Sequence, residues 1–354
     1  MQEAVQILNK YWGHKEFRPL QWPIIASVLE GENVLALLPT GGGKSICFQV
    51  PALMRSGICI VVSPLIALME DQVSNLQAKG IKAMAITGGI SYADLDNKLD
   101  NCIYGNYKFL YLSPERLQME LVQERIRLMN VNLIAVDEAH CISQWGHDFR
   151  PAYRNISIFN ELKPEVPVIA LTATATPPVI EDIKEQLKLP NLKLHKKSFY
   201  RPNIAYNVIY AEDKFYEVSK LLKSIEETAI IYVRSRNATT EIANYLQSQD
   251  YKAEAFHGGM KMADKKRKLE DWLQNKFRIM VATTAFGMGI DKPDVRHVIH
   301  LNLPENLESY FQEAGRAGRD GKYAEASVIT NKSDIPVLEN QFLAKLPSIP
   351  EIKE

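Results

Sequence analysis

Residues 34–45 read VLALLPTGGGKS, a short apolar run that leads into a glycine-rich turn and then into a helical stretch. The run predicts a buried strand, and the glycines allow backbone N–H groups to approach a phosphate closely. The start of the following helix also favours an anion. Leu38 stands where the strict phosphate-loop pattern has its first glycine, so a purely structural turn is the alternative. The residues expected to cradle phosphate are Thr40, Gly41, Gly42 and Gly43.

The next two residues, Lys44 and Ser45, have the side chains that a phosphate loop uses. We expect Lys44 to reach the β- and γ-phosphates of a nucleotide and the Ser45 hydroxyl to ligate Mg²⁺. The predicted ligand of this segment is therefore a nucleoside triphosphate, and we expect it to be ATP.

A second apolar run, Leu133–Val136, ends in Asp137-Glu138-Ala139-His140. Acidic residues at the carboxyl end of a buried strand lie in the ligand crevice of an open α/β sheet. We expect Asp137 to hold Mg²⁺ and Glu138 to orient the attacking water. The alternative is a solvated acidic turn. His140 either relays the state of the nucleotide to other elements or caps a turn.

Short β-rich runs alternate with helical stretches in two series along the chain. Such runs predict parallel sheets buried on both faces, and two series predict an α/β fold with two domains of similar plan. Lys196–Asn207 fits neither series, so we place the boundary near residue 205, with lobes at 1–205 and 206–340. Residues 341–354 are then a tail or the point where a longer protein was cut. The expected strands are 34–38, 59–63, 109–113, 133–137 and 168–172, then 229–233, 253–256, 279–282, 298–301 and 326–330.

The second lobe carries Arg316 and Arg319 among small residues, in the string QEAGRAGRDG. On a helix these arginines would share one face. Phosphoryl transfer needs positive charge on the transition state, so we expect Arg319 to be an arginine finger and Arg316 a second phosphate contact. The alternative is a solvated basic helix end. Because the phosphate loop is in the first lobe, hydrolysis would require the lobes to close.

Composition excludes several classes of protein. The N-terminus has no run of basic residues followed by an apolar stretch, the pattern of a secretory signal, and no apolar run is long enough to span a membrane. We therefore expect a cytoplasmic protein. The four cysteines form no CxxC pair and no zinc-type cluster, which predicts reduced thiols and no zinc site. Lys plus Arg equals Asp plus Glu at 42 each. Any grip on nucleic acid must therefore come from placed residues rather than net charge.

An ordered set of further strings resembles the motifs of superfamily 2 helicases, which implies two tandem RecA-like domains, each a mainly parallel sheet flanked by helices. The segment Ile142–Pro151, ISQWGHDFRP, is more specific and resembles the aromatic-rich loop of RecQ helicases. The resemblance covers roughly residues 5–330. Its other strings are Phe17–Gln21, Ser63–Met69, Ser113–Leu117, Leu171–Ala175 and Ala282–Asp291.

The resemblance implies roles at the nucleotide. Arg18 and Gln21 match the adenine-reading motif, and His14 stands at the position of an aromatic that stacks on the base. In the second lobe the residues matched to nucleotide contacts are Gly289, Asp291 and Gln312.

Trp145 and Phe149, followed by Arg150, suit base stacking combined with a phosphate contact. Two core aromatics are the alternative. By resemblance, this loop couples single-strand binding to ATP hydrolysis. Hydroxyls at strand ends would contact phosphates without reading sequence, as a motor requires. The remaining residues expected on DNA are Ser63, Ser113, Gln144, Thr174 and His257.

The resemblance implies an ATP- and Mg²⁺-dependent helicase that acts on single-stranded and tailed duplex DNA in repair or recombination, with 3′→5′ polarity. We also expect the chain to be a monomer. An RNA helicase of the same superfamily, a non-unwinding ATPase and a binding module without catalysis are the rivals. The residues after Thr330 are too few for the zinc-binding and winged-helix modules of RecQ proteins. We therefore expect weaker DNA affinity and unwinding than in a longer relative.

Overall fold

The computed structural model describes residues 1–144, 148–189, 191–223, 226–287 and 292–344. The chain divides into two compact units, Met1–Phe199 and Tyr200–Glu354. This division lies a few residues before the boundary expected near residue 205. Trp145, Gly289 and Asp291 lie outside the described residues, so their expected roles have no structural account. Within the described residues, no helix combines the length and apolar character needed to cross a membrane.

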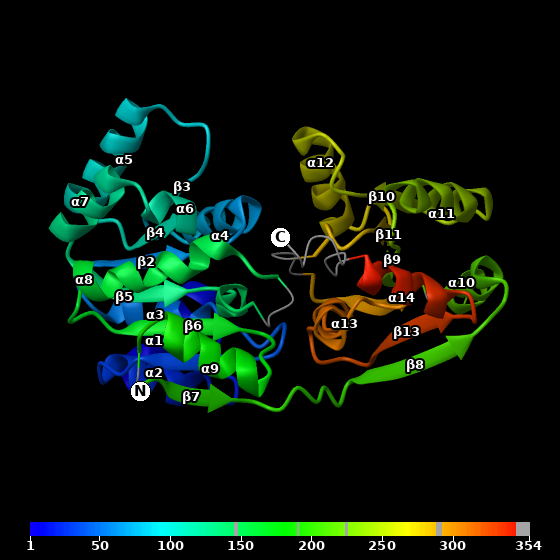
Figure 1. Cartoon of the computed structure of the whole chain (residues 1–354), viewed down its shortest axis with the longest axis horizontal. Coiled ribbons are helices and arrows are strands. Elements are labelled where there is room, and N and C mark those ends of the chain that lie inside the picture. The colour runs from blue at the N-terminus through cyan, green and yellow to red at the C-terminus, as the bar shows by residue number, and fades with distance from the viewer. Residues whose placement is uncertain (145–147, 190, 224–225, 288–291, 345–354) are drawn as a thin grey trace, which may run out of the picture. The chain divides into compact units, whose positions relative to one another are not determined.

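The first unit contains a seven-stranded sheet in the order β3-β4-β2-β5-β6-β1-β7, and every recorded strand pair in it is parallel (Figure 1). Its strands are β1 (Val34–Leu37), β2 (Ile58–Val62), β3 (Ala83–Ile86), β4 (Phe109–Leu112), β5 (Val131–Val136), β6 (Val168–Thr172) and β7 (Lys193–Lys196). Its helices are α1 (Gln2–Trp12), α2 (Gln21–Leu29), α3 (Ile46–Met54), α4 (Ile66–Ala78), α5 (Tyr92–Tyr104), α6 (Pro114–Leu117), α7 (Glu120–Leu128), η1 (Ala139–Ile142), η2 (Pro151–Ile158), α8 (Phe159–Leu162) and α9 (Pro177–Gln186).

Alternating residues of the central strands face opposite sides of this sheet, and each side has its own core. Leu35 and Leu37 face a core built with α5, α7 and α9, whereas Val34 and Ala36 face a core built with α2, α3 and α4. Helices therefore cover both faces, which explains why these strands read as continuous apolar runs rather than as alternating ones.

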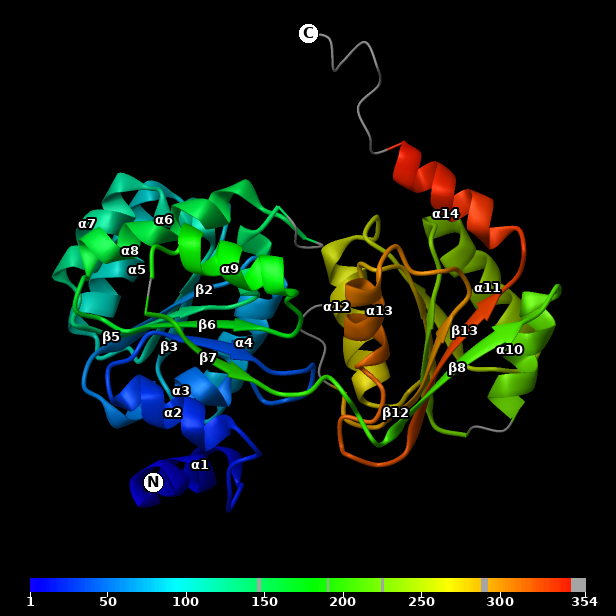
Figure 2. The same cartoon turned by 60° about the horizontal axis from the view of Figure 1, so that its bottom comes forward.

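The second unit contains a six-stranded sheet in the order β10-β11-β9-β12-β13-β8, again with parallel pairs. Figure 2 shows α12 and α13 on one face of this sheet and α10 and α11 on the other. Its strands are β8 (Ile204–Tyr210), β9 (Thr228–Tyr232), β10 (Ala253–Phe256), β11 (Ile279–Ala282), β12 (Val295–His300) and β13 (Ala324–Thr330). Its helices are α10 (Lys214–Lys223), α11 (Arg236–Ser248), α12 (Met262–Leu273), α13 (Leu307–Ala314) and α14 (Asp334–Leu343).

Two expectations about the segments between and after the lobes are wrong. Lys196–Asn207 is not outside both sheets, because Lys196 ends β7 and residues 204–207 begin β8. The polar and aromatic composition of this stretch hid two strands at the sheet edges, which are buried less completely than central strands. Likewise, α14 runs through Leu343, past the end of the lobe placed at residue 340.

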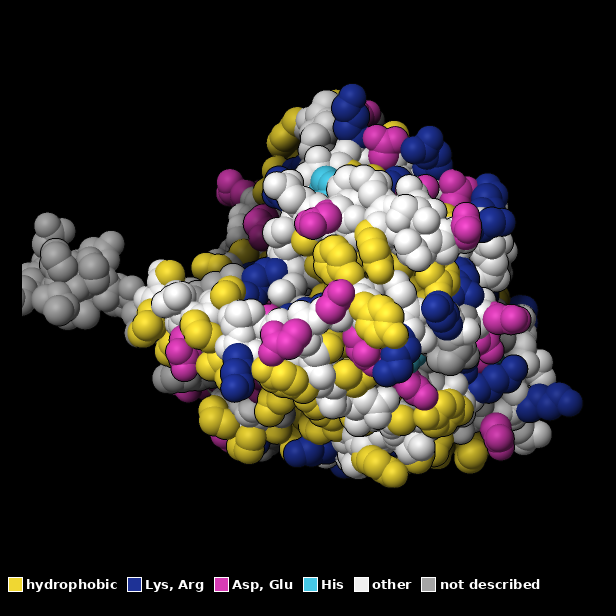
Figure 3. Space-filling view, turned by 90° about the vertical axis from the view of Figure 1, so that its right-hand side faces the viewer, with side chains coloured by type: hydrophobic (Ala, Val, Ile, Leu, Met, Phe, Trp, Pro, Cys, Tyr) yellow, Lys and Arg dark blue, Asp and Glu magenta, His cyan; other side chains and the backbone are white. Residues whose placement is uncertain are grey.

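The edge strand β8 exposes an apolar row. Tyr206, Val208 and Tyr210 alternate along the strand and are 39%, 78% and 56% exposed. Tyr206 also contacts the rings of Tyr310 and Phe311 on α13. Figure 3, viewed from the right-hand side of Figure 1, shows hydrophobic side chains among the charged ones on this face. The alternation explains why β8 does not read as a buried strand.

Candidate active site

The glycine-rich turn has the backbone that the sequence predicts, between β1 and α3. Gly41 and Gly43 have φ of 77° and 73°, in the left-handed region that favours glycine. A Cβ on Gly42 would lie 2.8 Å from the carbonyl oxygen of Pro39, to which the Gly42 N–H donates. Ser45 is the residue before α3. The loop therefore opens into a helix N-terminus, as a phosphate site requires.

Two residues matched to the adenine motif brace this loop from behind. The Gln21 side-chain amide donates to the carbonyl of Gly43 at 3.0 Å, and its oxygen accepts from the Arg18 N–H at 2.8 Å. The Arg18 guanidinium donates to the carbonyl of Gly41. His14 lies exposed, two residues after the end of α1. Contact of these residues with adenine stays a prediction, but Arg18 and Gln21 also hold the loop itself.

The acidic segment follows β5 at the same sheet edge. Burial raises the pKa of Asp137 to about 7, the neighbouring Glu138 adds to this rise, and the positive charge of Lys44 opposes it. Glu138 has φ of 49°, a left-handed conformation that costs a non-glycine residue energy and is typical of functional turns. Its Oε2 atom is buried, 3.4 Å from His140 Nδ1, and has no hydrogen-bond partner among the described residues. The structure therefore brings Lys44 and both carboxylates together.

His140 is buried, and a hydroxyl chain joins it to the end of β6. Its Nδ1 lies 2.9 Å from Thr172 Oγ1, and that hydroxyl donates to the carbonyl of Thr174 at 2.9 Å. The Thr172 hydroxyl has one proton and donates it to Thr174, so it can only accept from His140. The Nδ1 atom of His140 therefore carries a hydrogen and is the donor. His140 therefore does more than cap a turn, since it connects the acidic segment to the next strand end.

Sequence reasoning assigned no role to Thr172 or Tyr153, yet both contact this segment. Tyr153 is buried, and its hydroxyl donates to the carbonyl of Asp137 at 2.9 Å. Thr172 could have been found, because it is a hydroxyl at the end of a predicted strand. Tyr153 carried no such signal, since it lies in a short helix, η2, and its partner is a backbone atom.

The hydroxyl side chains expected to contact DNA lie at the carboxyl ends of β2, β4 and β6, of which β2 and β4 are adjacent in the sheet. Ser63 follows β2 and Thr174 lies just after β6, and both hydroxyl oxygens are buried without a hydrogen-bond partner among the described residues. Ser113 follows β4, and its oxygen accepts from the Arg116 N–H at 3.3 Å, which caps α6. All three lie along the edge that carries the phosphate loop, because carboxyl ends of parallel strands meet there.

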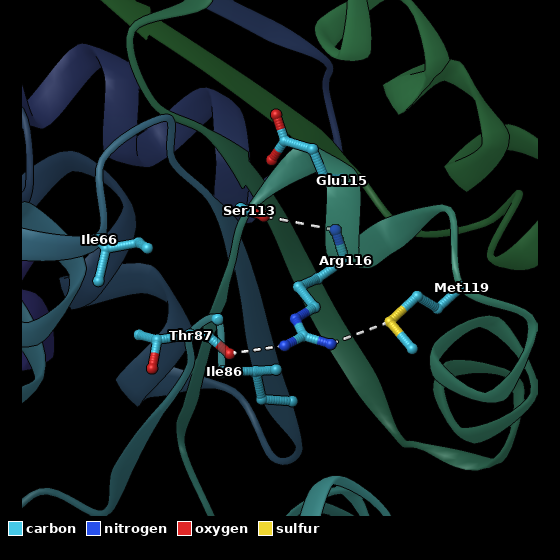
Figure 4. Close-up of a pocket in the computed structure, with 8 residues that line it drawn as sticks. Ile66, Ile86, Thr87, Ser113, Glu115, Arg116 and Met119 are labelled. Atoms are coloured by element: carbon cyan, nitrogen blue, oxygen red, sulfur yellow. Dashed lines mark hydrogen bonds between the residues drawn. The ribbon is translucent and has the colours of Figure 1, made fainter. Parts of the chain in front are cut away.

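A cavity of about 300 Å³ lies at this edge beside Ser113 (Figure 4). The Arg116 guanidinium lies across it, donating to the carbonyl of Thr87 at 2.9 Å and contacting the sulfur of Met119 at 3.1 Å. Arg116 thus joins the end of β3 to α6. The other residues that line the cavity are Ile66, Ile86, Gly88 and Glu115.

The described part of the aromatic-rich loop is held by its own arginine. Arg150 donates to the carbonyl of Pro64 at 2.8 Å and to the carboxylate of Asp148 at 3.2 Å. Phe149 is half-buried, with the Arg154 guanidinium 5.0 Å from its ring centre, and Gln144 is exposed. Arg150 therefore ties the loop to the segment after β2, and its expected phosphate contact stays a prediction.

The arginine motif of the second unit is not helical, which corrects the expected shared helix face. Helix α13 ends at Ala314, and residues 315–320, which we call the arginine turn, form consecutive turns. Gly315 follows the last residue of α13 and keeps a right-handed backbone, with φ of −64°. Arg316 is 6% exposed and packs against Gly287, where a Cβ would lie 2.8 Å from its guanidinium. Burial raises the pKa of Tyr232, and the charge of Arg316 opposes that rise.

Residues read from sequence as a linker brace the arginine turn. Arg201 donates to the carbonyls of Ala317 and Gly318 at 3.1 and 2.8 Å, and Asn203 donates to that of Gly318 at 2.8 Å. Their targets are backbone atoms far along the chain, which no sequence pattern shows. Two further expected contact residues of the second unit each have a buried nitrogen without a hydrogen-bond partner among the described residues. They are Gln312, on α13, and His257, after β10.

The fold and these residues define the class of tandem RecA-like helicase cores. A DEAD/DEAH box helicase model matches residues 18–183, and a helicase conserved C-terminal domain model matches residues 213–321. Among solved structures, this chain is similar to the DUF1998 helicase MrfA bound to DNA, with a TM-score of 0.76 and 19% sequence identity. The match covers 98% of this chain and 54% of the MrfA chain. The match to the DEAD-box helicase Mss116 bound to single-stranded RNA has the same TM-score and identity, and it covers 99% of this chain and 79% of the Mss116 chain. These likenesses confirm the fold.

Sequence relatives define the family. The ATP-dependent DNA helicase RecQ of Bacillus subtilis is 42% identical over 340 residues, which are 95% of this chain and 58% of the relative. The probable ATP-dependent DNA helicase RecS of the same organism is 40% identical over 344 residues, 96% of this chain and 69% of the relative. The chain belongs to the RecQ family of ATP-dependent DNA helicases, and it spans between about half and two thirds of the length of these relatives.

Proposed function

We propose that this chain is the ATP-hydrolysing motor of a DNA helicase, which moves along single-stranded DNA and separates duplex DNA in repair or recombination. One observation carries the proposal. The phosphate loop, the Asp137–His140 segment and the strand-end hydroxyls of Ser63, Ser113 and Thr174 share one edge of the first sheet. A nucleotide and a DNA strand bound at this edge would contact neighbouring strand ends. The names of the relatives support DNA as the polymer.

The residues of the nucleotide site fit Mg²⁺. Hard cations prefer oxygen ligands, and Ser45 and Asp137 supply a hydroxyl and a carboxylate. Burial raises the pKa of Asp137, and a cation bound beside it would oppose that rise; the buried Oε2 of Glu138, which has no hydrogen-bond partner among the described residues, also supports the proposal. Mg²⁺, when bound, would supply positive charge to the phosphates of the nucleotide. Ser45 and Asp137 are the residues proposed to hold it, directly or through water.

Glu138 is proposed to orient the water that attacks the γ-phosphate, while Lys44 binds the phosphate oxygens. Positive charge on the transition state is proposed to come from Arg319, with Arg316 as a second contact, supplied by the second unit when the units close on ATP. Closure and release would alternate with each cycle of hydrolysis. This alternation would move one unit along the strand relative to the other.

On the strand, hydroxyl and backbone contacts would hold phosphates without reading sequence. Phe149, with Trp145, is proposed to stack on bases, an interaction worth about 1–3 kcal/mol per base. His140 is proposed to pass the state of the nucleotide through Thr172 to Thr174, at the strand-binding edge. The direction of movement proposed is 3′→5′, by a monomer acting in the cytoplasm.

The test compares ATP turnover with no polymer, with single-stranded DNA and with single-stranded RNA, for the wild-type chain and Lys44→Ala. We expect turnover to rise at least tenfold with DNA, less with RNA, and to vanish in Lys44→Ala. Turnover that is equal with and without polymer would contradict coupling. Stronger stimulation by RNA than by DNA would favour an RNA helicase instead.

A further inference from the structure

Gln72, on α4, contacts the hydroxyl proposed to bind Mg²⁺. Its side-chain N–H donates to Ser45 Oγ at 3.0 Å, although 27 residues separate the two in sequence. Gln72 stands in the helix that follows the Ser63–Met69 string but lies outside that string. From this contact and its neighbours we infer that Gln72 is a positioning residue, which sets the Ser45 hydroxyl for Mg²⁺ and links it to α4. The inference rests on the proposed function of the site.

The orientation of the Gln72 amide is fixed by two further contacts. Its oxygen accepts from the Gln49 amide at 3.1 Å and from the Tyr111 hydroxyl at 3.3 Å. Burial raises the pKa of Tyr111, so this phenol stays protonated and can donate. Turning the amide over would place its N–H groups against the Gln49 N–H and lose that hydrogen bond, and it would require the Tyr111 hydroxyl to accept instead of donate. The N–H of Gln72 therefore faces Ser45.

This arrangement determines what the Ser45 hydroxyl can still do. A hydroxyl has one proton and two lone pairs, and one lone pair accepts from Gln72. One lone pair and the proton remain for a cation and a phosphate oxygen. Ser45 has no hydrogen bond that caps α3, so Gln72 supplies the contact that holds its side chain. Without Gln72, the hydroxyl would be free to rotate among rotamers, and binding of Mg²⁺ would have to order it.

The same helix reaches the proposed strand-binding edge. Helix α4 begins at Ile66, and the carbonyl of Pro64 just before it accepts from Arg150 of the aromatic-rich loop at 2.8 Å. Six residues separate Ile66 from Gln72, which is about 9 Å along a helix. Buried Met69 and the other apolar residues of α4 pack in the core that includes α3. A shift of α4 on binding a strand would therefore move the partner of Ser45, and the converse holds by linkage.

The chain offers a matched control on the same helix. The Gln77 side chain donates to the carbonyl of Ala83 at 2.9 Å, whereas the Gln72 side chain takes part in three hydrogen bonds, of which one is to Ser45. Gln72→Met and Gln77→Met each remove one amide from α4 and keep the side-chain length. Equal melting temperatures without nucleotide would show that the two changes perturb the fold alike.

The experiment measures binding of a fluorescent ATP analogue against Mg²⁺ concentration, without and with single-stranded DNA. In Gln72→Met without DNA, we expect the Mg²⁺ concentration at half-maximal nucleotide binding, the Mg²⁺ midpoint, to rise about fivefold. This factor corresponds to the loss of one net hydrogen bond, the bond to Ser45. We also expect DNA to tighten nucleotide binding less than in wild type. Gln77→Met should match wild type in both. Gln72→Glu replaces the N–H that faces Ser45 with an oxygen to which the Ser45 hydroxyl can donate, and this variant should need less Mg²⁺ than Gln72→Met.

Indistinguishable Mg²⁺ midpoints in Gln72→Met and Gln77→Met would overturn the positioning role. A normal effect of DNA in Gln72→Met, beside a raised midpoint, would overturn the link to α4. If DNA has no effect on wild-type binding or turnover, the proposed function fails by itself. The midpoint without DNA still decides the role of Gln72 at Ser45 in that case.

Discussion

Replacing Thr172 with valine tests whether the hydroxyl between His140 and Thr174 carries the effect of DNA on hydrolysis. Valine has nearly the same volume as threonine, so the change removes one oxygen without opening a large cavity. Thr172 is fully buried, and its oxygen contacts His140 Nδ1 and the carbonyl of Thr174 at 2.9 Å each. It also accepts from the Thr174 N–H at 3.3 Å.

The magnitude follows from these contacts. A net hydrogen bond contributes about 1 kcal/mol, and a buried polar group that loses its partner costs about 1–3 kcal/mol. We therefore expect Thr172→Val to lower the free energy of unfolding by about 2–4 kcal/mol. If the chain also transmits the effect of DNA, stimulation of ATP turnover should fall about tenfold, which corresponds to about 1.4 kcal/mol of lost coupling. Turnover without DNA should change much less.

Urea unfolding and ATP turnover at saturating single-stranded DNA measure the two quantities. Thr172→Ser is the control, because serine keeps the hydroxyl and should retain most of the stimulation. The reasoning is refuted if Thr172→Val loses stability as expected but is stimulated by DNA like wild type. In that case the hydroxyl chain holds the fold together and transmits nothing.

Three further predictions concern other contacts. Gly43→Ala should weaken ATP binding at least tenfold in an equilibrium titration, because φ is 73° and a Cβ would lie 2.4 Å from the Gln21 amide; unchanged affinity would argue against the loop geometry. Arg201→Met should lower DNA-stimulated turnover while leaving ATP binding intact, since it loosens the arginine turn; equal loss of both would point to general unfolding. Lys214→Met should destabilise the chain by about 2 kcal/mol at neutral pH, because Lys214 donates to the buried Asp334 at 2.6 Å. The ion pair lowers the pKa of Asp334 in the folded chain, so the loss of stability in Lys214→Met should be present above the unfolded pKa of about 3.9 and should shrink as pH falls through the folded value. Urea unfolding of both chains at a series of pH values measures it. A loss of stability that persists in acid would contradict the ion pair.

Periodicity predicted the central strands well, because burial on both faces leaves a continuous apolar run. Strands β6 and β11 have the predicted bounds, 168–172 and 279–282, and the edge strand β10 also has its predicted bounds, 253–256. The edge strand β8 was missed because one side of it is exposed and carries tyrosines. Local pattern also predicted the glycine-rich turn, because the left-handed backbone of Gly41 and Gly43 depends on residues close in sequence.

Contacts between distant segments could not be predicted from the sequence. Gln72 meets Ser45 and Arg201 meets the arginine turn only because the topology brings separate strand ends together. The helical arrangement expected for Arg316 and Arg319 was wrong, because the spacing of two arginines says nothing about where α13 ends. Residue type and order therefore indicated the chemistry, whereas the supporting contacts required the fold.

If ATP hydrolysis drives this chain along single-stranded DNA in one direction, as proposed, the chain should displace a bound protein from one end of the strand only. The most direct measurement follows displacement of streptavidin from a biotin at either end of a single strand. We expect ATP-dependent release from the 5′ end, little release from the 3′ end, and no release with Lys44→Ala. Equal release from both ends, or release that survives in Lys44→Ala, would contradict it.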